Sequence, residues 1–247
     1  MFPLPLFPTI ADDLEAMDSR QSVQHMNTFM KNTLIRGVNN VYDTASHVNN
    51  DRLAYHFLRY ATVVFDILRV HIEGDQKFFS TKNAKGTSLV DFLGIADSYA
   101  AEFSVLYSAV QGMQKKLQSW IKCPATYSSV EFRKTLETFS KPMLQSMTNQ
   151  RKALDRGHMM KFCAEPEMRG MITDNLHWLA SHSDVAVLLP FVLSHHDPAT
   201  SARWPNVAPE GLKLVPEFVN KDPICWAFAR FDPITKQKRS SRTLPSV

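Results

Sequence analysis

The chain of 247 residues is 44% hydrophobic and 21% charged, which suits one globular domain with an appendage. Its net charge of +4 is modest and lies partly in the terminal segment 236–242, so nucleic-acid binding is not indicated. The three cysteines are widely spaced and form no CxxC pair, which argues against a disulfide framework and against a zinc site.

The N-terminal segment and the apolar runs give an expectation for localisation. No apolar run reaches the roughly 20 residues that a membrane-spanning helix needs. Residues 1–8 are apolar, but they lack a basic region and are interrupted by prolines, so they do not resemble a signal peptide. We therefore expect a soluble, cytoplasmic protein without a membrane partner.

The distribution of proline predicts where the long helices lie. No proline occurs between Thr9 and Cys123, whereas prolines are closely spaced from Pro190 to Pro245. Because proline interrupts helix interiors, we expect long helices in the first stretch and an irregular end of the chain. The predicted units are an N-terminal arm (1–19), a helical bundle (20–185) and a C-terminal extension (186–247) that packs on the bundle and ends in a disordered basic tail.

Apolar residues at helical spacing predict four long helices. They cover about residues 22–42, 51–79, 88–120 and 128–158, and a shorter helix is expected at 167–181. Asp51 is the expected N-cap of the second helix, and Pro142 is expected to kink the fourth. Four long amphipathic segments with short connections predict an all-α fold, an antiparallel four-helix bundle.

The most informative motif lies in the second predicted helix. His71 and Asp75 are four residues apart, so they share one helical face. Such a pair can bind a metal in a bundle core or act as an acid–base pair. A di-iron bundle needs several more inward histidines and carboxylates, which the other predicted helices lack at matching places.

Three segments of the chain resemble a known family. The run Asn32–Tyr42 looks like the first helix of the fungal hemerythrin-like (HHE cation-binding) proteins, and Phe57–Phe79 resembles their second helix. Leu189–Asp197, with Trp204-Pro205 following, is similar to their C-terminal extension. The resemblance implies a hemerythrin-like bundle within about residues 20–235, in a family that holds two iron ions.

The family's metal ligands on its first two helices are partly kept. The first-helix histidine falls on Lys31, whose ammonium group has no free lone pair for a metal. The second-helix pair falls on His71 and Asp75, so a histidine and a carboxylate are kept as possible metal ligands.

The ligands on the last two helices are lost. The third-helix pair falls near Ala100 and Ser104, or near Tyr99 and Phe103 if the register slips by one. The fourth-helix positions fall near two further polar residues, Ser146 and Gln150. Alanine, serine and glutamine do not replace imidazoles in holding iron, so the resemblance implies no bound metal and no other cofactor.

Three interpretations of this substituted site stay open. The cluster of Lys31, His71 and Asp75 is a buried ion pair that only fills space, or it keeps a metal, or loss of the metal opened a cavity for an organic molecule. In the last case His71 is the proton shuttle, Asp75 its orienting carboxylate and Lys31 an electrostatic stabiliser. The expected lining then also includes the residues at the lost ligand positions: Ser104, Ser146, Gln150, Tyr99 and Phe103.

From the resemblance we predict a metal-free protein that binds a small apolar substrate and acts as a cofactor-independent isomerase, lyase (dehydratase) or cyclase of fungal secondary metabolism. This step is an analogy with the family and its fold. The alternatives are a hemerythrin-like iron- or oxygen-binding protein and a non-catalytic interaction protein that keeps only the fold. The small molecule is the predicted partner, and a homodimer is left open.

Two further groups have alternative roles. His195-His196-Asp197 is either catalytic or, as we expect, a turn held by the Asp197 side chain. Trp204, Trp226 and Phe228 either cap a pocket or, as we expect, pack the extension against the bundle.

Overall fold

The protein is helical throughout the part that the computed structural model describes, residues 2–10, 14–201 and 204–239. Two isolated bridges are the only β-type pairings among these residues, so the all-α prediction is confirmed. The α-helices are α1 (Ser19–Ala45), α2 (Asp51–Ser80), α3 (Leu89–Phe92), α4 (Ala96–Lys122), α5 (Ser129–Ala153), α6 (Arg156–Phe162), α7 (Glu165–His182), α8 (Val185–His195), α9 (Pro209–Asn220) and α10 (Pro223–Ala227).

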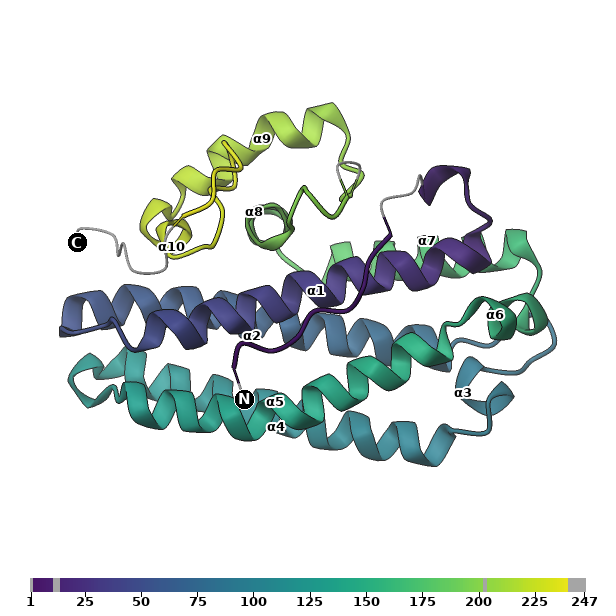
Figure 1. Cartoon of the computed structure of the whole chain (residues 1–247), viewed down its shortest axis with the longest axis horizontal. Helices are drawn as coiled ribbons and strands as arrows, with labels where there is room; N and C mark the ends of the chain where they lie inside the picture. Colours follow the sequence, from purple (N-terminus) through teal and green to yellow (C-terminus); the bar gives the residue numbers. More distant parts are fainter. Residues whose placement is uncertain (1, 11–13, 202–203, 240–247) are drawn as a thin grey trace.

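The four longest helices, α1, α2, α4 and α5, lie lengthwise beside one another (Figure 1). α2 packs on α4, α4 on α5, α5 on α1 and α1 on α2, so these helices form a ring around the main apolar core. We call this set the helical ring. The apolar stripe expected in the second helix is fully buried in it: Leu53, Phe57, Ala61, Val64, Leu68 and Ile72.

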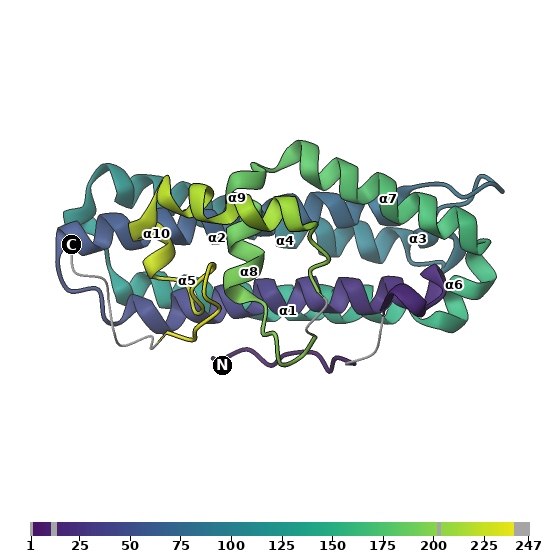
Figure 2. The same cartoon turned by 90° about the horizontal axis from the view of Figure 1, so that it is seen from above.

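α7 and α8 cover the side of the helical ring that α1 and α2 form. Viewed from above, α8 crosses the long helices and α7 runs beside them, while α9 and α10 lie over the other end (Figure 2). Two glycines permit this close packing. A Cβ on Gly74 of α2 would lie 2.8 Å from Leu179 of α7, and a Cβ on Gly37 of α1 would lie 3.1 Å from Phe191 of α8. A larger residue at either position would therefore force the side chains of α7 or α8 to shift.

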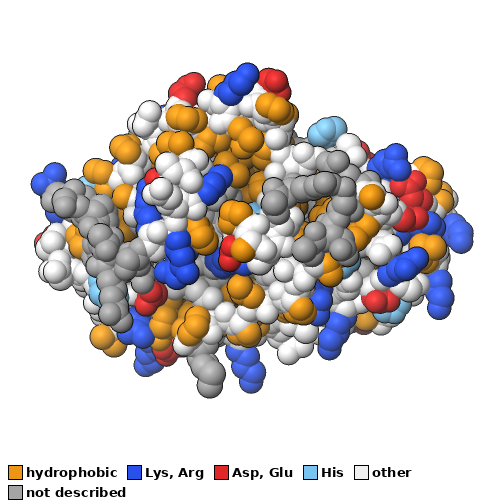
Figure 3. All heavy atoms as spheres, turned by 45° about the horizontal axis from the view of Figure 1, so that its top comes forward, with side chains coloured by type: hydrophobic (Ala, Val, Ile, Leu, Met, Phe, Trp, Pro, Cys, Tyr) orange, Lys and Arg blue, Asp and Glu red, His pale blue; other side chains and the backbone are white. Residues whose placement is uncertain are grey.

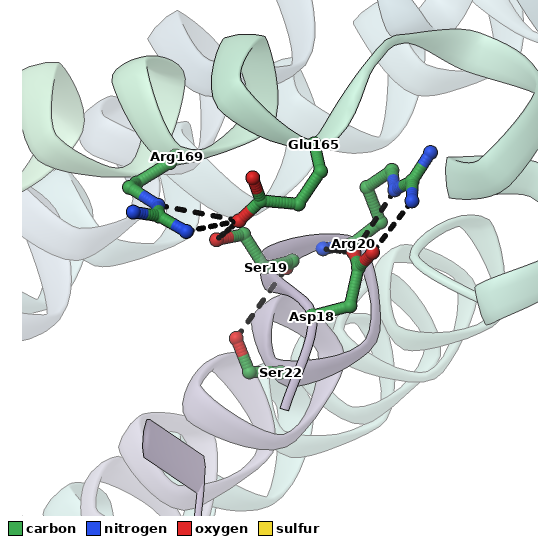
Figure 4. Close-up of polar contacts among 6 residues, drawn as sticks. All are labelled: Asp18, Ser19, Arg20, Ser22, Glu165 and Arg169. Carbon is green, nitrogen blue, oxygen red and sulfur yellow. Dashed lines mark hydrogen bonds and ion pairs between the residues drawn. The ribbon is translucent and has the colours of Figure 1, made fainter. Parts of the chain in front are cut away.

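A polar network holds the start of α7 on the start of α1 (Figure 4). Ser19 Oγ donates to Glu165 Oε1 at 2.9 Å, and Arg169 Nη2 lies 2.6 Å from the same oxygen. Asp18 caps α1 through the backbone N–H of Arg20 and also pairs with the Arg20 guanidinium. These contacts fix the direction in which α7 leaves this end of the molecule.

The N-terminal arm is held along α1 by two asparagine side chains. Asn39 accepts from the backbone N–H of Leu4 at 2.7 Å and donates to its carbonyl at 3.0 Å. Asn32 makes the same pair of bonds to Phe7, at 2.8 and 2.9 Å. Each side-chain amide thus pairs with the backbone N–H and the carbonyl of one arm residue. These bonds hold the arm in an extended conformation along α1.

The predictions for the third and fourth helices need correction. The third is divided by a turn at Leu93–Ile95, where Gly94 has a φ of +66°, a conformation that glycine adopts without strain. The side chains of Phe92 and Ala96 beside this turn are therefore exposed instead of lying on one apolar stripe. The fourth ends at Ala153, and residues 156–162 form the separate helix α6.

The predicted cap of the second helix is wrong by one residue. The side chain of Asn50 accepts from the backbone N–H of Leu53 at 2.8 Å, so Asn50 is the N-cap and Asp51 is the first helical residue. Pro142 lies inside α5, as expected.

The C-terminal extension is not irregular, because α8, α9 and α10 occupy most of residues 185–227. Pro209 and Pro223 are the first residues of α9 and α10, where proline is favourable because the missing N–H has no partner in a helix anyway. Of the predicted basic tail, Arg239 is ordered against the Asp232 carboxylate. The rest of that tail, residues 240–247, lies outside the described residues.

In the described part of the chain, no single helix has the length and apolar character to cross a membrane. α7 and α8 pass this test only when taken together, and the angle between them is 113°.

Candidate functional site

The side chains of Lys31, His71 and Asp75 meet between α1 and α2, and we call them the His71 cluster. Lys31 Nζ lies 2.7 Å from Asp75 Oδ2 and 3.4 Å from His71 Nε2, and His71 Nε2 lies 3.3 Å from Asp75 Oδ2. Their exposed fractions are 0%, 6% and 5%. The structure thus brings together the three residues that the sequence analysis groups into one cluster.

Burial governs the charge state of the His71 cluster. It lowers the pKa of His71 to about 4, with the Asp75 carboxylate opposing the shift and the Lys31 ammonium adding to it. It also lowers the pKa of Lys31, and Asp75 again opposes the shift. His71 is therefore a neutral imidazole near pH 7, held between a cation and an anion.

An apolar groove of about 360 Å³ opens between α1, α2, α7, α8 and the segment 204–206. His71 and Asp75 line it. Most of its wall is apolar, with side chains contributed by every surrounding element: Met26, Met30, Ile67, Leu179, Leu188 and Trp204. Figure 3 shows the side of the molecule that carries α7–α10, where hydrophobic side chains gather in the upper middle.

Three buried polar atoms of groove residues have no hydrogen-bond partner among the described residues. They are His71 Nδ1, Asn27 Oδ1 and Asn175 Oδ1. Asn27 Nδ2 donates to Asp75 Oδ1 at 3.4 Å, which leaves its oxygen unused. A buried polar atom without a partner costs about 1–3 kcal/mol. All three atoms belong to residues that line the same groove.

The substrate-binding residues expected at the lost ligand positions do not line this groove. Ser104 is exposed, as is Ala100, so the side chains that face inward from α4 are those of Tyr99 and Phe103. Tyr99 and Phe103 are the pair that the alternative register, shifted by one residue, names.

Ser146 and Gln150 are buried in α5, but they too lie outside the groove, as does Lys31. Large side chains such as Leu106 and Met147 are buried in the core of the helical ring. The expected cavity is therefore displaced to the outer side of α1 and α2.

Tyr99 lies near the His71 cluster without joining it. Burial raises the pKa of Tyr99, and the negative charge of Asp75 adds to the rise. The side chain of Gln150 opposes the rise.

Sequence reasoning missed the two groove residues whose buried amide oxygen has no partner in the described part of the chain, Asn27 and Asn175. Asn27 precedes Lys31 by four residues, so a search for amides on the same helical face would have found it. Asn175 had no such signal, because its place depends on how α7 packs against α2. Met26 and Met30 belong to the predicted apolar stripe of the first helix but are only half-buried, since they line the groove.

A second buried histidine, His195, is part of a hydrogen-bonded network. Tyr60 Oη donates to His195 Nε2 at 2.6 Å, and His195 Nδ1 donates to the Phe191 carbonyl at 2.8 Å. Asn40 Nδ2 donates to Tyr60 Oη at 2.8 Å and to the Phe228 carbonyl at 2.7 Å. We call Asn40, Tyr60 and His195 the His195 network. It joins α1, α2 and α8 to the residue after α10.

The turn expected after His195 is confirmed, because Asp197 Oδ1 accepts from the backbone N–H of Ala199 at 3.0 Å. Trp226 and Phe228 are buried in the main core, as expected for packing of the extension. Trp204 instead lines the apolar groove, which is the alternative role considered for it.

Among residues 2–10, 14–201 and 204–239, no three side chains of His, Cys, Asp or Glu converge in a way that could hold a metal ion. Comparison of the chain with models of protein families, with curated proteins and with solved structures found no match.

Proposed function

We propose that the apolar groove binds a small, largely apolar organic molecule and that His71 moves a proton on it. One observation carries this proposal: His71 lines the groove, and its Nδ1 is the ring nitrogen not engaged with Lys31 and Asp75. A volume of about 360 Å³ suits a small organic molecule, since ligand pockets begin at roughly 300 Å³.

The chemistry assigned to the site is proton transfer without a cofactor. With a proton on Nε2 donated toward Asp75, the Nδ1 lone pair of His71 accepts a proton from the substrate and returns it to another atom of the same molecule. Asp75 stabilises the transient imidazolium, and the Lys31 charge favours negative charge that develops nearby. No electrons are exchanged, so the activity is that of an isomerase, lyase or cyclase, which we place in fungal secondary metabolism.

We further propose that the helical ring is a hemerythrin-like antiparallel four-helix bundle whose iron site has been replaced. The positions of the family's ligands do not fit two iron ions. Only His71 and Asp75 offer ligand atoms, and the Lys31 ammonium lies 2.7 Å from the carboxylate oxygen that a metal would need.

Elemental analysis tests the iron part of this proposal. Protein purified without chelator is expected to hold well under one iron per chain. Two irons per chain would overturn the metal-free assignment and favour the alternative of an iron- or oxygen-binding protein.

A pair of matched probes tests the ligand part. Naphthol has an apolar body and one hydrogen-bond donor, whereas methoxynaphthalene has a similar body and no donor. Calorimetric titration is expected to show naphthol binding roughly tenfold more tightly, as one added hydrogen bond predicts. The difference should disappear in His71→Leu. Equal binding of both probes to the unmodified protein would contradict the role of Nδ1.

A filled groove gives the matching control for location. Ala180→Phe places a ring in the groove, whereas Ala101→Phe makes the same change at an exposed site on α4. Naphthol binding should be lost in the first variant and kept in the second. Native mass spectrometry of the purified protein would then identify a co-purifying molecule, which Ala180→Phe should not retain.

A further inference from the structure

A second pocket, of about 570 Å³, lies between the N-terminal arm, α1, α5, Asp197 and the segment 230–238. Four cationic side chains line it, Arg36, Arg133, Arg230 and Lys238, together with the carboxylates of Asp43 and Asp197. We call it the arginine pocket. Its lining carries an excess of positive charge, and Figure 3 shows Lys and Arg side chains left of the centre of this side of the molecule.

The guanidinium groups of the arginine pocket have no carboxylate partner. Arg36 is half-buried in α1 and makes no ion pair or hydrogen bond with a described residue. Burial lowers its pKa, and Asp197 opposes that shift from beyond ion-pair distance. Arg230 also has no side-chain hydrogen bond among the described residues. Arg133 Nη2 donates to Tyr42 Oη at 2.9 Å, but its buried Nε has no partner.

Five arginines elsewhere in the molecule are paired with carboxylates, whereas Arg151, which lies over the Phe7 ring, has a buried Nε without a partner among the described residues. The five with a carboxylate partner within 3 Å are Arg20, Arg59, Arg69, Arg169 and Arg239. A partly buried guanidinium without a counter-charge loses hydration and gains nothing in return. Arg36 and Arg230 are two such groups around one cavity, and Arg133 lies over the Tyr42 ring at 4.3 Å beside them, so an anion can supply the missing partner.

Stacking and hydrogen bonds hold the walls of the arginine pocket in position. Phe2 of the N-terminal arm stacks on Tyr42 with 3.8 Å between ring centroids, and Asn39 fixes the backbone of Leu4. On the opposite wall, the backbone N–H of Arg239 donates to the Arg230 carbonyl at 2.8 Å, which closes a turn over residues 231–238. The arginines are thus presented on a fixed frame, as an anion site requires.

We propose that the arginine pocket binds a small organic dianion with an apolar body, a phosphate monoester in particular. The two acidic residues offset part of the four positive charges, and a phosphate monoester carries about −1.5 to −2 at pH 7. The planar guanidinium group matches the geometry of phosphate oxygens in bidentate fashion. Phe2, Leu6 and Phe231 provide the apolar surface for the body of the ligand. This site is independent of the apolar groove.

Calorimetric titration with phenyl phosphate tests the proposal. Binding is expected to weaken roughly 10- to 100-fold in Arg36→Gln, since one charge-assisted contact is lost. Arg52→Gln removes the same charge from an exposed site of α2 and should leave the affinity unchanged. Phthalate, a dicarboxylate of similar size, distinguishes the sources of the charge: tighter binding of phenyl phosphate supports the phosphate assignment, and tighter binding of phthalate overturns it.

Two other outcomes overturn the site itself. One is the absence of phenyl phosphate binding at about 1 mM, a concentration at which even weak specific sites are occupied. The other is an equal loss of affinity in Arg36→Gln and Arg52→Gln, which would show attraction by net charge alone. Arg230→Gln serves as the second pocket variant if Arg36→Gln does not fold.

Discussion

The two buried histidine clusters of this protein are alike in burial and different in their hydrogen bonding. His71 and His195 each lie where the helical ring meets its cover, and burial lowers the pKa of each to about 4. In the His195 network both ring nitrogens have partners, Tyr60 and the Phe191 carbonyl. In the His71 cluster one nitrogen has none, and the residue lines a groove.

This difference shows which property indicates function. Burial and a shifted pKa are shared, so neither separates a structural histidine from a functional one. Unused hydrogen-bonding capacity beside a cavity is the property in which His71 and His195 differ, and the proposed role of His71 rests on it. A fully satisfied polar network stabilises one arrangement of the core, whereas an incomplete one has capacity left for a ligand.

Exchange of each histidine for glutamine is expected to give the largest difference between the two clusters, in turnover and in Tm. His71→Gln should cut turnover of the bound substrate by roughly 10²–10⁴-fold, the usual contribution of a general acid–base group, with little change in Tm. His195→Gln should lower Tm and keep the turnover. The rate is measured on the molecule that native mass spectrometry identifies in the purified protein. Full activity of His71→Gln would remove the catalytic role.

Removal of one charge from the His71 cluster is expected to have the next largest effect, on the free energy of unfolding. Asp75→Ala leaves the Lys31 ammonium buried and unpaired, which should lower the free energy of unfolding by roughly 3–5 kcal/mol. Lys31→Met/Asp75→Leu removes both charges and should restore much of that loss. Urea denaturation measures both changes. A stable, inactive double variant supports catalysis by the cluster, while a stable and fully active one shows that the charges only fill space.

Acid should destabilise the protein through both histidines. Their folded pKa of about 4 is below the unfolded value of 6.5, so the unfolded chain binds more protons between these pH values. The free energy of unfolding should therefore fall as the pH drops from about 6.5 to 4, at about 1.4 kcal/mol per pH unit for each histidine. Urea denaturation across this range should show a smaller slope in His195→Gln and an unchanged one in His158→Gln, since His158 is exposed.

Tyr60→Phe is expected to give the smallest effect. It removes the donor to His195 Nε2 and the acceptor of Asn40 Nδ2, and one unsatisfied buried group costs roughly 1–3 kcal/mol. Tyr55→Phe removes an exposed hydroxyl and is the matched control. Naphthol binding should be the same in both variants. A loss of binding in Tyr60→Phe would mean that the two clusters are coupled.

The sequence was most informative where a relation is local. The 3.6-residue period places the apolar stripes of α2 and α5 on one face each, and those stripes are buried. The same period puts His71 and Asp75 side by side one turn apart. The approach of Lys31 was inferred by way of the family resemblance, and the structure brings it to 2.7 Å from Asp75.

The tertiary structure alone decided where the cavity lies. Gly94 divides the third predicted helix, so Ser104 faces outward and Tyr99 inward. Gly74 lets α7 approach α2, and the groove lies on that side of the His71 cluster, away from Ser146 and Gln150. Helix periodicity determines which residues share a face. It does not determine which neighbour covers that face, because this depends on contacts between segments far apart in the chain.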